Sequence, residues 1–214
     1  EVGLRGVVID EISGAQGWKQ HGQHTAPLEH GADVLLPHSV ERLLVAAEDV
    51  HRVDFSRMMG EDEAGTLAQL KRFRGHVFDP LTAKHGGRIV KLMGDGALVE
   101  FASVVQAVAC AVALQGAAKA HEPDLPEDRR LRLRIGVNLG DVIVEAGDLY
   151  GDGVNIAARL EALAEPGGIC ITAKVRDEVG SRLDIGFEDL GPVVDSGTVA
   201  PMMIAAQATS NLPP

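Results

Sequence analysis

Residues 88–101 read RIVKLMGDGALVEF, two apolar runs joined by Gly94-Asp95-Gly96. Glycines on both sides of an aspartate supply the backbone freedom that a tight turn requires, so the stretch predicts a β-hairpin. The turn carries a carboxylate, Asp95, and the incoming strand carries a cation, Lys91, four residues earlier. Hairpins with an Asp-Gly turn and a solvated lysine are common, so this stretch alone does not establish a function.

The composition is that of a globular protein. The 214 residues allow one domain with tails, and 45% are hydrophobic and 24% charged. Only 3% are aromatic, which argues against nucleic-acid modules that stack bases. The net charge of -11 repels a phosphate backbone or an anionic membrane. A small anionic ligand such as a nucleotide would therefore need a metal ion or a local cationic pocket.

The sequence also favours a cytoplasmic location. Cys110 and Cys170 lie far apart in apolar runs, and we expect buried thiols in a reducing compartment. The longest apolar run, around residues 104–114, is too short to span a bilayer. No signal peptide is evident at the N-terminus. We therefore expect a cytoplasmic protein without membrane contact, unless the chain is a piece of a longer receptor.

Residues 1–40 show no helical or strand period, and we expect an N-terminal arm there. Its histidines match no standard metal-site spacing, and no cysteine accompanies them. We expect one domain over residues 41–207 and a C-terminal tail over residues 208–214.

Strand and helix patterns alternate through the domain. A buried strand is predicted to end at Glu48-Asp49, and a helix is predicted to begin at Glu61-Asp62-Glu63. Leu67, Leu70, Phe73 and Val77 are expected to form the apolar face of that helix. Further segments are predicted as helix (103–120), strand (131–144), loop (147–153) followed by a helix, strand (169–171) and helix (174–183). This order predicts an α+β fold with a mostly antiparallel sheet and flanking helices, compatible with a ferredoxin-like split βαβ arrangement.

Three polar side chains after the hairpin form, together with Lys91 and Asp95 in it, an unusual set for a structural protein. Asp148 begins a loop rich in glycine and aspartate, and Asn155 and Arg159 follow on the predicted helix. Because Asn155 and Arg159 are four residues apart, they share one face of that helix.

Two segments carry a resemblance to the catalytic domain of class III nucleotide cyclases. They are GGRIVKLMGDG at residues 86–96 and DLYGDGVNIAARL at residues 148–160. The chain is most similar to the bacterial adenylate cyclase branch, from about Arg42 to Leu190, and the two motifs together are highly specific. The resemblance implies the α+β sandwich of the nucleotide cyclase type.

The resemblance also implies roles for the polar side chains. Asp49 and Asp95 would bind two Mg²⁺ or Mn²⁺ ions per site, and Lys91 and Asp148 would read the purine. Asn155 would orient the ribose and Arg159 would stabilise the transition state. The implied reaction converts ATP into 3′,5′-cyclic AMP and pyrophosphate. In the family the site lies between two chains placed head to tail, so a homodimer is implied, and a regulatory domain outside this chain is possible.

The chain departs from the family pattern at the first metal position. In the family an aspartate ends the first strand and precedes a short loop and an aromatic-Ser or aromatic-Thr pair. Here Asp49 ends the predicted strand and Phe55-Ser56 supplies the pair, but the loop between them is longer. An ungapped alignment would put His51 at the metal position and Asp54 on a glycine. We favour Asp49, because an apolar strand precedes it and histidine is a poor magnesium ligand.

A second departure leaves two alternatives open. The family's triphosphate-binding lysine follows Glu-Asp-Leu-Gly, present here at residues 188–191, but the aligned position holds Ser196. The alternative to an active cyclase is therefore a catalytically impaired nucleotide-binding or dimerisation module in signalling. A guanylate or diguanylate cyclase is disfavoured, because Lys91 and Asp148 suit adenine and the Gly-Gly-acidic-acidic-Phe run of diguanylate cyclases is absent.

Overall fold

The computed structural model describes residues 38–49, 54–121, 123–126, 129–145, 148–191, 193–194, 198–199 and 201–204. The strands are β1 (His38–Asp49), β2 (Gly87–Met93), β3 (Gly96–Phe101), β4 (Leu133–Glu145), β5 (Asp148–Tyr150), β6 (Ile169–Thr172), β7 (Phe187–Asp189), β8 (Val193–Val194), β9 (Thr198–Val199) and β10 (Pro201–Ile204). The helices are α1 (Asp54–Phe73), the π-helical turn η2 (Arg74–Phe78), α2 (Asp79–Lys84), α3 (Val104–Ala120), α4 (Asp152–Leu163) and α5 (Ala173–Val179).

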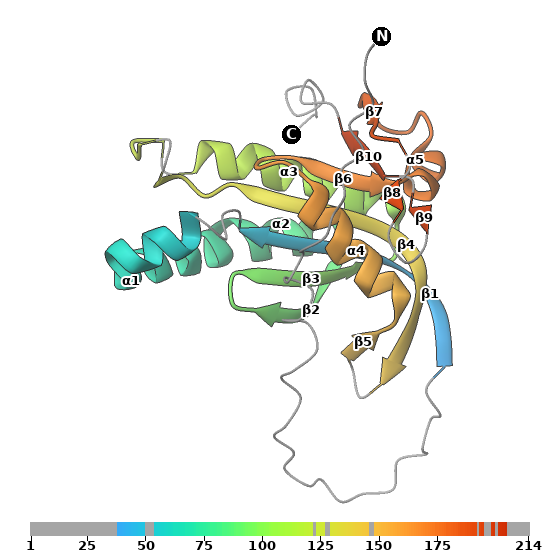
Figure 1. Ribbon diagram of the computed structural model, residues 1–214, viewed down its shortest axis with the longest axis horizontal. Helices are drawn as coiled ribbons and strands as arrows, with labels where there is room; N and C mark the ends of the chain where they lie inside the picture. The colour runs from blue at the N-terminus through green and yellow to red at the C-terminus, as the bar shows by residue number, and fades with distance from the viewer. Residues whose placement is uncertain are drawn as a thin grey trace, which may run out of the picture.

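One eight-stranded sheet organises the molecule. Its strand order is β2-β3-β1-β4-β6-β10-β7. The eighth strand, β5, is not part of this order and pairs with β4. Strands β4 and β6 pair in parallel, and the neighbouring pairs on either side are antiparallel. Helices cover both faces, with α4 in front of the sheet and α2 and α3 behind it in Figure 1. The predicted α+β fold with a mostly antiparallel sheet is therefore confirmed.

The two faces of the sheet bury separate apolar clusters. Because side chains alternate along a strand, Val45 and Leu44 point to opposite faces. Val45 belongs to a large cluster with side chains of α1, η2, α3 and α5, and we call this side the α3 face. Leu44, Leu98 and Val142 belong to a smaller cluster with side chains of α4 and β5, and we call this side the α4 face.

The predicted elements are largely observed, with shifted ends. β1 begins at His38, before the expected strand and inside the segment 1–40 that was expected to be an arm. The rest of that arm, residues 1–37, and the expected tail, with residues 205–214, lie outside the described residues. α5 ends at Val179, earlier than expected, and Gly180 follows with φ +54°. Both cysteines are buried thiols that take part in no disulfide, as expected. The part of the chain that the structure describes includes no helix long and apolar enough to cross a membrane.

The first helix is interrupted near its predicted start. α1 is kinked at Asp62, which has φ -153° and ψ 83°. The Asp62 carboxylate accepts a hydrogen bond from the Gly65 N–H at 2.9 Å, as a helix N-cap does. A helical segment therefore starts at the predicted acidic residues. Leu70 and Phe73 are buried, whereas Leu67, at the same helical spacing, is 40% exposed.

Helix α4 approaches the sheet closely at one glycine of β4. A Cβ added to Gly136 would lie 2.2 Å from the Ala157 carbonyl oxygen and 2.4 Å from the Glu161 nitrogen. Such distances are far below van der Waals contact, and both atoms belong to backbone that cannot rotate away. The absence of a side chain at residue 136 therefore sets the position of α4 on the sheet.

We predict that Gly136→Ala destabilises the protein by about 3 kcal/mol, because overpacking forces α4 and β4 apart. The matched control is Gly116→Ala inside α3, where a Cβ meets nothing within 4 Å. This control is expected to stabilise the protein by about 0.5–1 kcal/mol, since alanine suits a helix better than glycine. Urea unfolding of both variants measures the difference, and equal midpoints for Gly136→Ala and the parent would refute the prediction.

Candidate active site

A β-bulge determines which face of the sheet Lys91 occupies. In the β2–β3 hairpin Ile89 pairs with Val99, but Lys91 pairs with Leu98, so the register shifts by one residue between them. Without the shift Lys91 would pair with Ala97, which belongs to the cluster on the α3 face. With it, Lys91 stands opposite Leu98, whose side chain belongs to the cluster on the α4 face. One extra residue in a strand changes the face of everything that follows it, and here it brings the lysine to β5.

Lys91 and Asp148 form an ion pair on the α4 face. The Lys91 Nζ donates to Asp148 Oδ2 at 2.8 Å, and the two side chains are 29% and 26% exposed. Asp148 begins β5, which pairs with the end of β4 and extends below α4 in Figure 1. The residues that the sequence assigned to purine reading are therefore brought together from segments 57 positions apart.

The surroundings of Asp148 keep it ionised. Burial raises the pKa of Asp148. Three effects that lower the pKa outweigh burial: the hydrogen bond from Lys91, the hydrogen bond from the Leu149 N–H at 2.9 Å and the charge of Lys91. The net pKa lies below that of an ordinary aspartate. Asp148 is thus a pure hydrogen-bond acceptor at neutral pH, beside a side chain that only donates.

Tyr150 is a further member of this group that the sequence analysis missed. It follows Asp148 by two residues on β5, so both side chains point to the same side of that strand. A side-chain hydrogen bond to Asp148 raises the pKa of the Tyr150 phenol, and the Lys91 Nζ lies 6.0 Å from the centre of its ring. Tyr150 is 47% exposed, and its ring offers an apolar surface beside the ion pair. The alternation of β5 could have indicated it.

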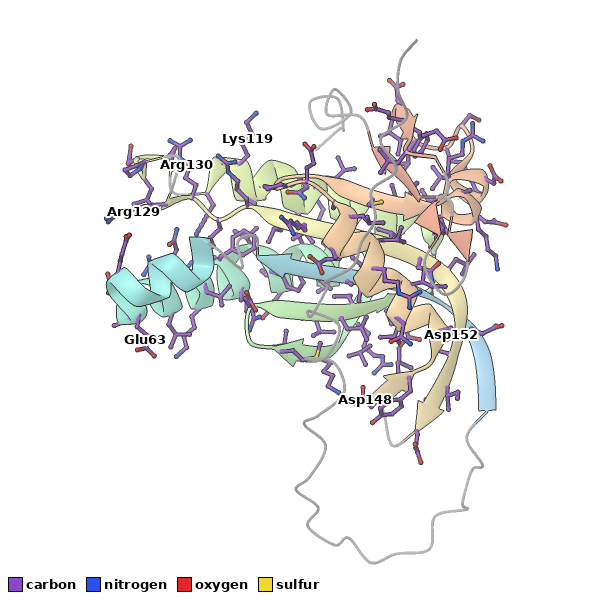
Figure 2. The ribbon with its side chains drawn as sticks, viewed as in Figure 1. Glu63, Lys119, Arg129, Arg130, Asp148 and Asp152 are labelled. Atoms are coloured by element: carbon purple, nitrogen blue, oxygen red, sulfur yellow. The ribbon has the colours of Figure 1, made fainter. Side chains whose placement is uncertain are left out.

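Helix α4 carries Asn155 and Arg159 on one face, as predicted. Asn155 is exposed and Arg159 is half-buried, whereas Leu160 is fully buried beneath them. The start of the helix is fixed by Asn138 of β4, a buried side chain that donates to the Gly153 carbonyl oxygen at 3.0 Å. In Figure 2, Asp148 and Asp152 are labelled at the starts of β5 and α4.

Asp95 lies at the tip of the β2–β3 hairpin, in the predicted turn. Met93 pairs with Gly96, which leaves Gly94 and Asp95 as a two-residue connection, and Gly94 has φ +58°. The Asp95 side chain is half-buried. The backbone of this turn receives hydrogen bonds from an arginine side chain, as described below.

The strand register brings a second aspartate to this turn. β1 pairs with β3 so that Glu48 lies opposite Gly96. Asp49 follows Glu48 at the end of β1, and Asp95 precedes Gly96 in the turn, so both residues lie at the same end of the β1–β3 pair. Asp49 is the last residue of β1, whereas Asp54 begins α1 and His51 lies outside the described residues. The assignment of Asp49 to the first metal position stays a prediction.

The donor atoms of Asp49 and Asp95 can be compared with those that divalent cations prefer. Within the described part of the chain, no group of three or more His, Cys, Asp or Glu could by itself hold a metal ion. Mg²⁺ and Mn²⁺ favour oxygen ligands, and one or two carboxylates normally bind Mg²⁺ together with substrate phosphates and water. Asp49 and Asp95 match that donor set. Ser196 lies outside the described residues, so the predicted loss of a lysine at that position stays a prediction.

Comparison with known proteins identifies the family. Residues 50–201 match the profile of the adenylate and guanylate cyclase catalytic domain. The chain is 51% identical over 153 residues to a putative adenylate cyclase 3 of Rhizobium meliloti, covering 72% of this chain and 26% of that protein. It is 33% identical over 141 residues to an adenylate cyclase of Streptomyces coelicolor, covering 64% of this chain and 34% of the relative. The chain thus spans about a quarter to a third of these relatives.

A solved structure supports the same assignment. The crystal structure of an adenylate/guanylate cyclase/hydrolase from Silicibacter pomeroyi is similar with a TM-score of 0.72 and 35% identity, covering 79% of this chain and 98% of that one. The profile covers well over half of the chain and includes the hairpin, β5 and α4. The chain belongs to the adenylate and guanylate cyclase catalytic domain family.

Proposed function

We propose that this chain is an adenylate cyclase domain that converts ATP into 3′,5′-cyclic AMP and pyrophosphate. The observation that carries the proposal is the ion pair between Lys91 and Asp148. Adenine presents an acceptor at N1 and a donor at its 6-amino group, which a lysine and an aspartate can pair with directly. Guanine presents the opposite pattern and would leave each group unpaired, at a cost of about 1–3 kcal/mol each.

In the proposed reaction the ribose 3′-hydroxyl attacks the α-phosphorus and pyrophosphate leaves. Asp49 and Asp95 would bind two divalent ions, which lower the pKa of the hydroxyl and neutralise phosphate charge. Asn155 would orient the ribose through its exposed amide. Arg159, one helical turn later, would donate hydrogen bonds to the phosphorane oxygens as their charge grows.

We further propose that the site forms between two copies of this chain in a head-to-tail homodimer. Lys91, Asp148, Asn155 and Arg159 belong to the α4 face. The carboxylate turn is instead bound by an arginine that comes from the helices of the α3 face. A symmetric pair in which the turn of one copy meets the α4 face of the other would contain two complete sites.

We predict that the purified protein forms cyclic AMP from ATP and Mn²⁺, and that Asp95→Asn lowers kcat at least about 100-fold, because the substitution removes a charged ligand. The matched control is Asp177→Asn on α5, an exposed aspartate that pairs with Arg176. This control is expected to keep parental activity. A parent protein that is folded and dimeric but forms no product would favour the impaired binding module instead.

We predict that Asp148→Asn reduces the preference for ATP over GTP by about tenfold or more, because an amide can donate as well as accept. The quantity to measure is kcat/KM for each nucleotide. Asp152→Asn at the exposed start of α4 is the matched control and is expected to preserve the preference. An unchanged ratio in Asp148→Asn would remove this residue from purine selection.

A further inference from the structure

A half-buried arginine, Arg74, contacts the turn that carries the proposed metal-binding carboxylate. Its Nη2 donates to the Gly94 carbonyl oxygen at 2.8 Å and to the Gly96 carbonyl oxygen at 3.3 Å. These two carbonyls belong to the residues immediately before and after Asp95. One side chain therefore binds the backbone on both sides of the carboxylate without engaging the carboxylate through either bond.

The backbone of this turn is one that hydrogen bonds can usefully restrict. Two glycines flank Asp95, and glycine restricts the backbone less than any other residue. Gly94 has φ +58°. A carboxylate that binds a metal must keep a fixed direction, since small displacements weaken coordination and slow the reaction. Hydrogen bonds from a charged donor to both neighbouring carbonyls restrict the peptide planes around Asp95.

The local helix geometry places Arg74 at this turn. Arg74 is the first residue of η2, where the Asp79 N–H bonds to the Arg74 carbonyl oxygen, five residues back. Pro80 follows at the start of α2 and has no N–H to continue the regular α-helical pattern. A π-turn inserts one extra residue and rotates the side chains before it relative to those after it. Phe73 and Phe78 stay buried in the core while Arg74 reaches the hairpin.

We propose that Arg74 is a positioning residue for metal binding: it fixes the turn around Asp95 so that the carboxylate is already oriented before metal and nucleotide arrive. This inference rests on the proposed function of Asp95. It adds a residue that the sequence motifs had not indicated. Residues that orient a ligating side chain typically change metal affinity or activity by about 10–100-fold when removed.

The test compares Arg74→Met with Arg74→Lys and with a control in the same hairpin, Arg88→Met. Arg88 pairs with Glu100 near the open end of the hairpin, far in sequence from the turn, so its removal costs the hairpin an ion pair but leaves the turn bonds in place. Arg74→Lys keeps a charged donor on a shorter side chain. Thermal unfolding of each variant establishes that it is folded, and Arg74→Lys carries the test if Arg74→Met is not.

Two readouts are independent of product formation. Electron paramagnetic resonance of free Mn²⁺, with 2′,3′-dideoxy-ATP as the nucleotide, gives the metal affinity. We expect about a tenfold loss for Arg74→Met, a smaller loss for Arg74→Lys and none for Arg88→Met. Hydrogen exchange without metal or nucleotide should be fastest in the segment around residues 93–97 for Arg74→Met, intermediate for Arg74→Lys and parental for Arg88→Met.

The inference would be overturned if Arg74→Met kept the parental Mn²⁺ affinity and the parental rate of hydrogen exchange in the turn. It would also be overturned if Arg88→Met lost as much Mn²⁺ affinity as Arg74→Met. Cyclic AMP formation by the parent is measured separately. A parent that binds Mn²⁺ and dideoxy-ATP but forms no product contradicts the proposed function and leaves the Arg74 comparison valid. An active parent whose Arg74 variants behave like it contradicts only this inference.

Discussion

The register shift between Ile89 and Lys91 is the constraint on which the proposed site depends. One extra residue in β2 transfers Lys91 from the side of the sheet that buries Ala97 to the side that buries Leu98. Only there can its ammonium group meet Asp148 at 2.8 Å. A regular hairpin with the same sequence would direct the lysine into the apolar layer beneath α3, where an unpaired charge is strongly unfavourable. The bulge therefore stabilises the fold and creates the proposed purine pocket at once.

The same sheet separates the two halves of the proposed chemistry. The α4 face carries the ion pair and the helix with Asn155 and Arg159, and close packing at Gly136 together with the buried amide of Asn138 fixes that helix. The carboxylate turn is tied instead to Arg74 and so to the helices of the α3 face. Contacts within one chain hold each half in place, and the proposed reaction requires the halves of two chains to meet. Dimerisation would then control activity without any change within the chain.

Local patterns predicted much of this arrangement, and long-range geometry supplied the rest. The Gly-Asp-Gly turn, the alternation of β4 and the spacing of Asn155 and Arg159 depend on neighbouring residues, so the sequence indicates them directly. Helical spacing groups Leu67 with Leu70 and Phe73, but it does not indicate how much of each side chain the rest of the fold covers. Arg74 left no sequence signal, since its partners lie 20 and 22 residues away and the π-turn determines its direction. Asn138 could have been singled out as a polar residue within an apolar strand.

The most direct test of a site shared between two chains is a mixing experiment with Asp95→Asn and Arg159→Ala. Each variant alone lacks one half of both sites and should be inactive, whereas a mixed dimer contains one site with both halves intact. If the chains exchange freely, an equal mixture should regain about a quarter of parental cyclic AMP formation, because half of the dimers are mixed and each has one of its two sites. An inactive mixture, with mixed dimers demonstrated by co-purification through a tag on one variant, would contradict the two-chain site.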